Sequence, residues 1–388
     1  MKKITALFMS GWMVGGSLLH AAPPATVDER MNRMIDDALV ALYNLDYPGS
    51  KAAFQKLSEL YPDHPIGRYG LTTALWWELT NEYDEKNDVL EKEFMVEADR
   101  TIEMTRTMVK RGDPSGVGRL CLGGSLGLKA RWDAIQGHWL AAYRSGKQAY
   151  DLQTEAARIN PELYDAYLGP GIFHYYVAVL PSAVKVFARM VFGGSKSQGL
   201  EEIRLAMNKG RFSKTAALLF LVNIYTNNEK DPAAALVLIR DGRKQFPDSP
   251  FFHFIELLIL EEARDWNGLE AGATDFLARV HDQHPHYGPR FEHRGLFALS
   301  NSYLGKGETE RALALYSRIL ADFAFEDRWI TLTYLNRGKA LDQMGRREDA
   351  LADYRAVLKR RDVWQLHDKA KALIRRPYTP PPPTSARP

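Results

Sequence analysis

The feature that most constrains this chain is a residue spacing that recurs near its C-terminal end. Within residues 296–354, a set of small, aromatic and aliphatic residues returns after 38 positions. The two sets are Leu296, Ser300, Tyr303, Gly307, Ala312 and Tyr316, followed by Tyr334, Gly338, Leu341, Gly345, Ala350 and Tyr354. Because the agreement holds position by position, we interpret it as two copies of one structural unit. A chain of such units stacks them side by side.

Each copy has the pattern of two amphipathic helices joined by a turn at a glycine. Small residues such as Ser300 and Ala312 let the two helices approach closely, and the large residues fill the space between neighbouring hairpins. Looser copies are predicted at residues 34–65, 116–161 and 216–250, and around Trp266 and Ala271. Strand patterns of alternating Val, Ile and Thr are absent. We therefore expect about six to eight hairpins, with irregular segments at residues 80–115 and 170–212.

The intervals resemble those of tetratricopeptide repeats over most of residues 30–365, with the strongest agreement in the last two units. The resemblance implies an all-α fold, an α-solenoid of tetratricopeptide-like hairpins that form a right-handed superhelix. The central stretch also resembles a eukaryotic tetratricopeptide group associated with the outer mitochondrial membrane. That second resemblance is carried by Leu180-Pro181, Gly193-Gly194 and Gly199-Leu200. It concerns the fold and implies no active site.

The two ends of the chain differ from the repeats. Lys2 and Lys3 precede an apolar stretch at residues 4–19, which predicts a secretory signal peptide over residues 1–21 with cleavage after Ala21. An uncleaved membrane anchor is the alternative. A linker at 22–30 is expected next, then irregular hairpins at 31–212 and a regular array at 213–370. Residues 371–388 are proline-rich, and we interpret them as an inert tail rather than a spacer or a ligand for another module.

Charge and cysteine content exclude a nucleic-acid partner and an internal disulfide. Removing residues 1–21 takes away Lys2 and Lys3 and leaves 49 basic against 48 acidic residues. A nearly neutral chain lacks the concentrated basic charge that nucleic-acid binding needs, so no nucleic-acid partner is expected. Cys121 is the only cysteine, which excludes an internal disulfide, and its apolar neighbours predict a buried thiol.

Five residues are candidates for binding a peptide on the concave side of the array. In tetratricopeptide proteins that bind extended peptides, asparagines on this face hold the backbone of the ligand. The resemblance assigns that role to Asn301 and Asn336, with Asn223 equivalent to Asn301 in the earlier unit. Arg294 and Lys339 would add charge for an acidic partner. An asparagine on an exposed helix face is otherwise ordinary, which is the alternative.

Two further patterns were weighed as sites. The histidines in residues 281–293 are closely spaced, as transition-metal ligands are, but no helical H-E-x-x-H motif accompanies them. A solvated polar loop explains His281, His284, His286 and His293 better, so no metal site is predicted. Residues 170–192 are apolar enough to raise the question of peripheral membrane contact, but Pro181, Lys185 and Arg189 interrupt the stretch, which favours a buried hairpin.

No catalytic motif is found in a context that would support it. Residues 116–128 are rich in glycine, but no strand precedes them and no Gly-Lys-Ser/Thr follows, so tight helix packing explains them better than phosphate binding. The sequence therefore predicts no enzyme activity and no cofactor. It predicts a periplasmic or secreted scaffold that binds a protein or peptide. A membrane- or lipid-associated helical protein that uses residues 170–192 is the alternative.

Overall fold

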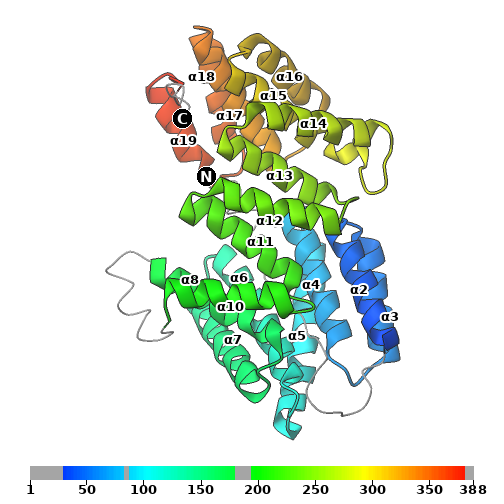
Figure 1. The fold of residues 1–388 in the computed structure, drawn as a ribbon. Coiled ribbons are helices and arrows are strands. Elements are labelled where there is room, and N and C mark those ends of the chain that lie inside the picture. The colour runs from blue at the N-terminus through cyan, green and yellow to red at the C-terminus, as the bar shows by residue number, and fades with distance from the viewer. Residues whose placement is uncertain (1–28, 83–86, 180–193, 381–388) are drawn as a thin grey trace. The chain divides into compact units, whose positions relative to one another are not determined.

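The computed structural model describes residues 29–82, 87–179 and 194–380, and within these residues every regular element is helical (Figure 1). The helices form two compact units, one reaching to Pro247 and the other beginning at Asp248. The all-α class predicted from the repeat spacing is confirmed.

The N-terminal unit contains ten of the helices in the described residues. They are α2 (Glu29–Tyr43), α3 (Tyr47–Leu60), α4 (Ile66–Asn81), α5 (Asp88–Arg111), α6 (Val117–Ile135), α7 (Trp139–Ile159), α8 (Leu168–Val179), α10 (Lys196–Lys209), α11 (Lys214–Ile224) and α12 (Pro232–Gln245). Consecutive helices pack against each other from α2 to α12. The pairs α2/α3, α4/α5, α6/α7, α8/α10 and α11/α12 are therefore helical hairpins, stacked in chain order.

The C-terminal unit continues the same pattern with seven helices. They are α13 (Pro250–Ala263), α14 (Trp266–His281), α15 (Glu292–Lys306), α16 (Thr309–Asp322), α17 (Arg328–Gln343), α18 (Arg347–Lys359) and α19 (Leu366–Arg375). The first six pair as α13/α14, α15/α16 and α17/α18, and α19 packs on α18. The succession of hairpins is the α-solenoid arrangement expected from the sequence.

Capping residues fix where the helices of the C-terminal unit begin. The side chain of Ser249 accepts the N–H of Phe252, and Pro250 occupies the first turn, where its missing N–H costs nothing. Asp265 and Asp327 accept N–H groups in the same way at the starts of α14 and α17. Because α12 ends at Gln245 and α13 begins at Pro250, residues 246–249 separate these two helices.

Small residues allow helices to approach closely, both within a hairpin and between neighbouring hairpins. A Cβ atom added to Gly338 on α17 would lie 2.5 Å from the Tyr354 ring on α18, so only glycine allows this approach. In the N-terminal unit, a Cβ at Gly124 on α6 would overlap the Tyr69 hydroxyl on α4. The glycine-rich stretch at 116–128 therefore serves helix packing, and Cys121 within it is buried as expected.

The hairpin α11/α12 packs against α10 and groups with the N-terminal unit, and the C-terminal unit begins at Asp248. The predicted ranges, irregular hairpins at 31–212 and a regular array at 213–370, stay predictions.

Several predicted segments lie wholly or partly outside the described residues. They are the signal peptide at 1–21, most of the linker at 22–30, residues 180–192 of the apolar segment, Leu180-Pro181 and Gly193, and residues 381–388. Residues 170–179 of the apolar segment belong to α8, where Ile172, Tyr175 and Val177 are buried. Among the described helices, none combines the length and apolar character needed to cross a membrane. The right-handed superhelix stays a prediction.

Candidate functional site

One row of helices in the C-terminal unit lines the inner side of the hairpin stack. The helices α13, α15 and α17 contact each other in succession, whereas α14, α16 and α18 make at most slight contact with one another. The row whose members touch must lie on the shorter side of a curved stack. The first helices of the three hairpins therefore form an inner row, as expected for tetratricopeptide-like hairpins.

Three of the five predicted peptide-binding residues come together on this inner row. Asn336 on α17 donates from Nδ2 to Oδ1 of Asn301 on α15, at 2.9 Å. Asn301 in turn donates from Nδ2 to Glu261 Oε2 on α13, at 2.8 Å. Lys339 Nζ donates to Asn336 Oδ1 at 2.9 Å. We call Glu261, Asn301, Asn336 and Lys339 the polar ladder, because it links the three inner helices.

The ladder is largely withdrawn from solvent. The exposed fractions of Asn301 and Asn336 are 5% and 4%, and both lie among apolar helix contacts. The hydroxyl of Tyr316, on the outer helix α16, also donates to Asn301 Oδ1, at 2.5 Å. Burial raises the pKa of Tyr316 well above its usual value, so this hydroxyl stays protonated and acts as a donor. The carbonyl oxygen of Asn301 thus accepts two hydrogen bonds at once.

The other two predicted residues lie elsewhere. Asn223 on α11 belongs to the N-terminal unit, where its Nδ2 donates to the Tyr176 hydroxyl at 2.8 Å. Arg294 lies at the start of α15, with its guanidinium 5.2 Å from the centre of the Phe291 ring. Neither residue is joined to the polar ladder by a described hydrogen bond. The peptide-binding role of all five residues stays a prediction.

A buried carboxylate at the end of α17 was missed by the sequence analysis. The Asp342 side chain has no exposed area and forms an ion pair with Arg347, with Nη1 and Oδ1 2.9 Å apart. Its Oδ2 accepts the Tyr354 hydroxyl and the backbone N–H of Tyr378, each at 2.8 Å. Because Asp342 is one turn beyond Lys339 on the same helix, this cluster adjoins the polar ladder.

Four members of these clusters are not marked by the repeat pattern, and they are Glu261, Asp342, Arg347 and Tyr378. Tyr316 is a repeat residue whose hydrogen bond to Asn301 was not predicted. One signal was available for Glu261, which is an acid near the end of a largely apolar helix, 40 residues before Asn301. That separation is close to one repeat length, so an acid and an amide on successive inner helices were candidates for a hydrogen bond. No comparable spacing marks Tyr378, which follows the last repeat.

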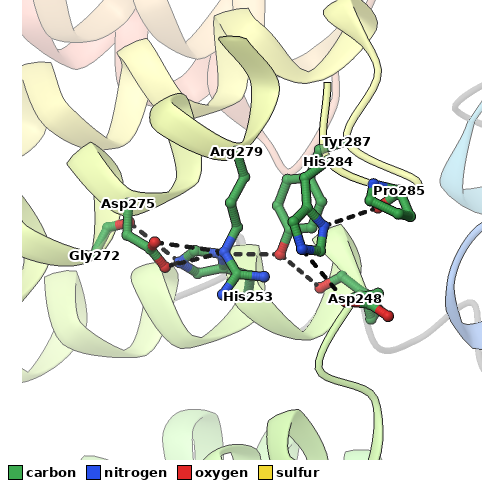
Figure 2. A network of polar contacts seen from close by, with 9 residues as sticks. Asp248, His253, Gly272, Asp275, Arg279, His284, Pro285 and Tyr287 are labelled. Atoms are coloured by element: carbon green, nitrogen blue, oxygen red, sulfur yellow. Dashed lines mark hydrogen bonds and ion pairs between the residues drawn. The ribbon is translucent and has the colours of Figure 1, made fainter. Parts of the chain in front are cut away.

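The predicted histidine cluster does not converge on one point. His284 contacts Asp248, with Nε2 and Oδ1 3.6 Å apart, while His281 and His286 are exposed. Figure 2 shows His284 beside Tyr287, whose hydroxyl reaches toward His253. Within the ranges that the structure describes, no group of three or more His, Cys, Asp or Glu side chains is arranged to hold a metal ion.

His253 on α13, which the sequence analysis did not single out, is the centre of this network. It is wholly buried, with Nδ1 3.0 Å from the Tyr287 hydroxyl and Nε2 3.2 Å from the Gly272 carbonyl oxygen. Asp275 Oδ2 lies 3.7 Å from Nε2, and Arg279 pairs with the same carboxylate (Figure 2). Both ring nitrogens are therefore occupied within the protein. The network joins α13, α14 and the loop before α15, which indicates a structural role.

His293 lies apart from the other histidines and contacts the start of α17. Its ring is 2% exposed and packs 5.6 Å from Phe323, with Nε2 3.7 Å from Asp327 Oδ1. Burial alone would raise the pKa of Asp327, but His293, the positive charge of Arg294 and the Trp329 N–H together lower that pKa to about 2. Asp327 is thus held as a carboxylate that caps α17.

A second chain of ionisable groups lies in the N-terminal unit, between α7, α8 and α10. The Tyr150 hydroxyl is 3.0 Å from Nε2 of His174, and Nδ1 of His174 is 2.6 Å from Glu202 Oε2. The His174 side chain is buried, and burial raises the pKa of Tyr150. Each of the three side chains comes from a different helix and contacts the next one. These contacts therefore join α7, α8 and α10.

The stacked hairpins and the inner row define the class of this protein. It is a helical repeat protein with a tetratricopeptide-like fold. No protein-family model matches the chain, and no curated protein matches it.

Solved structures that are similar to this chain include the following two. One is a monomeric mutant of IFIT1 with Gppp-AAAA, at 13% identity, covering 90% of this chain and 88% of that one, with a TM-score of 0.47. The other is the Cut9-Hcn1 hetero-tetramer of APC/C, at 14% identity, covering 89% of this chain and 70% of that one, with a TM-score of 0.32. The packing of consecutive helices into hairpins by itself defines the fold.

Proposed function

We propose that this chain is an exported, non-enzymatic scaffold that binds a protein or peptide partner along the inner row of its C-terminal unit. The observation that carries the proposal is the arrangement of α13, α15 and α17. They present one continuous row of helices with Lys339, a half-buried cation, at the edge of the polar ladder. Such a row offers side chains of several hairpins to one extended ligand.

Export to the periplasm or to the outside of the cell is supported by the sequence alone. The basic residues Lys2 and Lys3, the apolar stretch after them and the small residues up to Ala21 have the form of a secretory signal. Mass spectrometry of the N-terminus of the protein recovered from the cell envelope or the medium tests this. A chain that begins at Ala22 supports cleavage after Ala21, and a chain that retains residues 1–21 contradicts it.

The binding face is tested by a photo-crosslinking amino acid placed at position 339 in the full chain. The matched control places the same amino acid at Arg355, which is exposed on the outer helix α18. We expect crosslinked partner from position 339 and little from position 355. Equal crosslinking at both positions, or crosslinking at 355 alone, would contradict binding along the inner row.

Peripheral membrane contact through residues 170–192, and the resemblance to the outer-mitochondrial-membrane group, stay predictions. The burial of Ile172 and Tyr175 in α8 favours internal packing for the first part of that segment. Flotation of the mature chain with liposomes separates the two alternatives. Chain that rises with the vesicles would support membrane contact.

A further inference from the structure

The segment that follows the last helix is in contact with the inner row. Residues 376–380 come after α19, and the backbone N–H of Tyr378 donates to Asp342 Oδ2 on α17, at 2.8 Å. The ring of Tyr378 lies 5.7 Å from Lys339 Nζ, which is also on α17. Both contacts of Tyr378 are therefore with an inner helix, next to the polar ladder.

The end of α19 is held in a position that directs this segment to Asp342. Arg347 Nη2 donates to the carbonyl oxygens of Leu373 and Ile374 in the last turn of α19, at 2.9 and 2.7 Å. The same guanidinium pairs through Nη1 with Asp342. Since α19 and Asp342 share one arginine, the chain leaves the helix close to the carboxylate that accepts the Tyr378 N–H.

Tyr378 is the anchoring residue of the segment. Its neighbours Arg376, Pro377, Thr379 and Pro380 are exposed, whereas Tyr378 is half-buried. Burial raises the pKa of Tyr378, and the positive charge of Arg264, at the end of α13, partly offsets this rise. The phenol thus lies within the electrostatic influence of a second inner helix, in addition to its contacts with α17.

We propose that Asp342 and Lys339 form a peptide-binding subsite for an extended, proline-flanked tyrosine, and that Tyr378 of the chain itself occupies it. The buried Asp342 carboxylate accepts a backbone N–H, which any residue except proline supplies. Lys339 selects an aromatic ring through its ammonium group. Prolines on either side keep the ligand extended, so little conformational entropy is lost when it binds. The inferred external ligand is therefore a peptide segment of the form Pro-Tyr-x-Pro.

A tail that occupies this subsite must leave before such a segment of a partner can enter. Because the tail is covalently attached, its effective concentration at the subsite is high, and it competes with a free peptide of the same sequence. This inference rests on the proposed function, in that both place the ligand on the inner row. It adds the class of ligand and the presence of a built-in competitor.

The test compares the full chain with a chain that ends at Arg375. The probe is a fluorescein-labelled peptide with the sequence of residues 375–388, and binding is followed by fluorescence anisotropy. We expect the shortened chain to bind it and the full chain to bind it at least about tenfold more weakly. The Tyr378→Ala variant of the full chain keeps α19 and every other helix, so it provides a second way to remove the tyrosine from the subsite. It should bind the probe more tightly than the unmodified chain does.

The matched control is the same peptide with its tyrosine replaced by alanine, which should bind the shortened chain at least about tenfold more weakly, because it lacks the ring that contacts Lys339. Equal binding of both peptides, equal binding of the probe by the full and shortened chains, or no binding by the shortened and Tyr378→Ala chains would each overturn the inference. Crosslinking of a partner from position 339, repeated in the chain that ends at Arg375 and so lacks Tyr378, does not depend on this probe or on the tail. The proposed function is therefore tested independently of this inference.

Discussion

Replacing Asn301 with alanine should destabilise the C-terminal unit more than replacing Asn336 does. Asn301 is the central member of the polar ladder, with hydrogen bonds to three different helices. Its Oδ1 accepts the Tyr316 hydroxyl and the Asn336 amide, and its Nδ2 donates to Glu261. Asn336 lies at one side of the ladder, between Asn301 and Lys339.

The magnitudes follow from which partners are left in a buried position. A buried donor that loses its acceptor costs about 1–3 kcal/mol. Asn301→Ala removes an acceptor from the wholly buried Tyr316 hydroxyl and from the Asn336 amide, so a loss of about 3 kcal/mol is expected. Asn336→Ala keeps the hydrogen bond from the Tyr316 hydroxyl to Asn301, and the Lys339 ammonium can then bond to solvent instead. The expected loss of unfolding free energy is therefore about 1 kcal/mol.

Urea unfolding followed by circular dichroism measures these losses. Hydrogen exchange of peptides from α15 and α17 assigns them to the C-terminal unit, because two units need not unfold in one step. Asn267, exposed on α14, provides the control, and Asn267→Ala should change the free energy of unfolding by less than about 0.5 kcal/mol.

A double-mutant cycle with Tyr316→Phe tests the cause. If the Tyr316 hydroxyl that has lost its acceptor accounts for much of the lost stability, Asn301→Ala should be about 1–2 kcal/mol less destabilising in the Tyr316→Phe background. The reasoning is refuted if Asn301→Ala costs no more than Asn336→Ala, or if Tyr316→Phe leaves its cost unchanged.

Three other predictions concern packing, pH and capping. Gly338→Ala should cost about 1–3 kcal/mol in urea unfolding, because the new Cβ would lie 2.5 Å from the Tyr354 ring. The pKa of Asp327 is lowered to about 2, so its contribution to stability is present above its usual pKa of about 4 and is lost as the pH falls toward 2. Asp327→Asn should therefore cost about 2 kcal/mol at neutral pH and flatten the loss of stability between about pH 4 and 2, measured by urea midpoints across that range. Asp165→Ala should cost about 3 kcal/mol and speed hydrogen exchange in α11, because the buried carboxylate accepts three backbone N–H groups and the Ser213 hydroxyl at the start of that helix.

Control variants separate these causes from general effects. Gly345→Ala has open space around its Cβ but a φ of +73°, so it measures backbone strain without a clash, at about 1 kcal/mol. Asp265→Asn replaces another capping aspartate of the same unit. If it flattens the acid dependence as much as Asp327→Asn does, the special role of Asp327 is contradicted. For Asp165, a rise in exchange throughout the N-terminal unit, rather than in α11, would contradict local capping.

The hairpins were predictable from sequence because their requirements are local. Gly338 must be small where Tyr354 crosses it, and the residues between them set the length of two helices and a turn. The start of α13 is set locally as well, since Pro250 and the capping Ser249 act on the turn next to them. These features depend on residues within one repeat length of each other.

The candidate site was predictable only in part, for a physical reason. The register placed Asn301 and Asn336 on the first helices of their hairpins, and both lie on the inner row. It did not reveal that they bond to each other and to Glu261, because such contacts depend on how the hairpins stack. The tail was interpreted as inert, since nothing in the order of its residues indicates that Arg347 turns Tyr378 toward Asp342.

The described hydrogen bonds of Asn301 limit how a partner can be recognised. A peptide N–H that bonded to Asn301 Oδ1 would have to compete with the Tyr316 hydroxyl and the Asn336 amide, and a peptide carbonyl that took the N–H bonded to Glu261 would gain little for the bond that it broke. Lys339, at the edge of the ladder, donates to Asn336 and lies beside the Tyr378 ring, and a partner that reaches this half-buried ammonium meets a positive charge. Asn301→Ala should therefore weaken partner capture only together with stability, whereas Lys339→Gln should weaken capture of an acidic partner at a cost in stability of about 1 kcal/mol or less, because the glutamine amide can still donate to Asn336. Lys359→Gln, on the outer helix α18, is the matched loss of charge and should leave capture intact. Weaker capture by Asn301→Ala at unchanged stability would instead show that the asparagine itself touches the ligand.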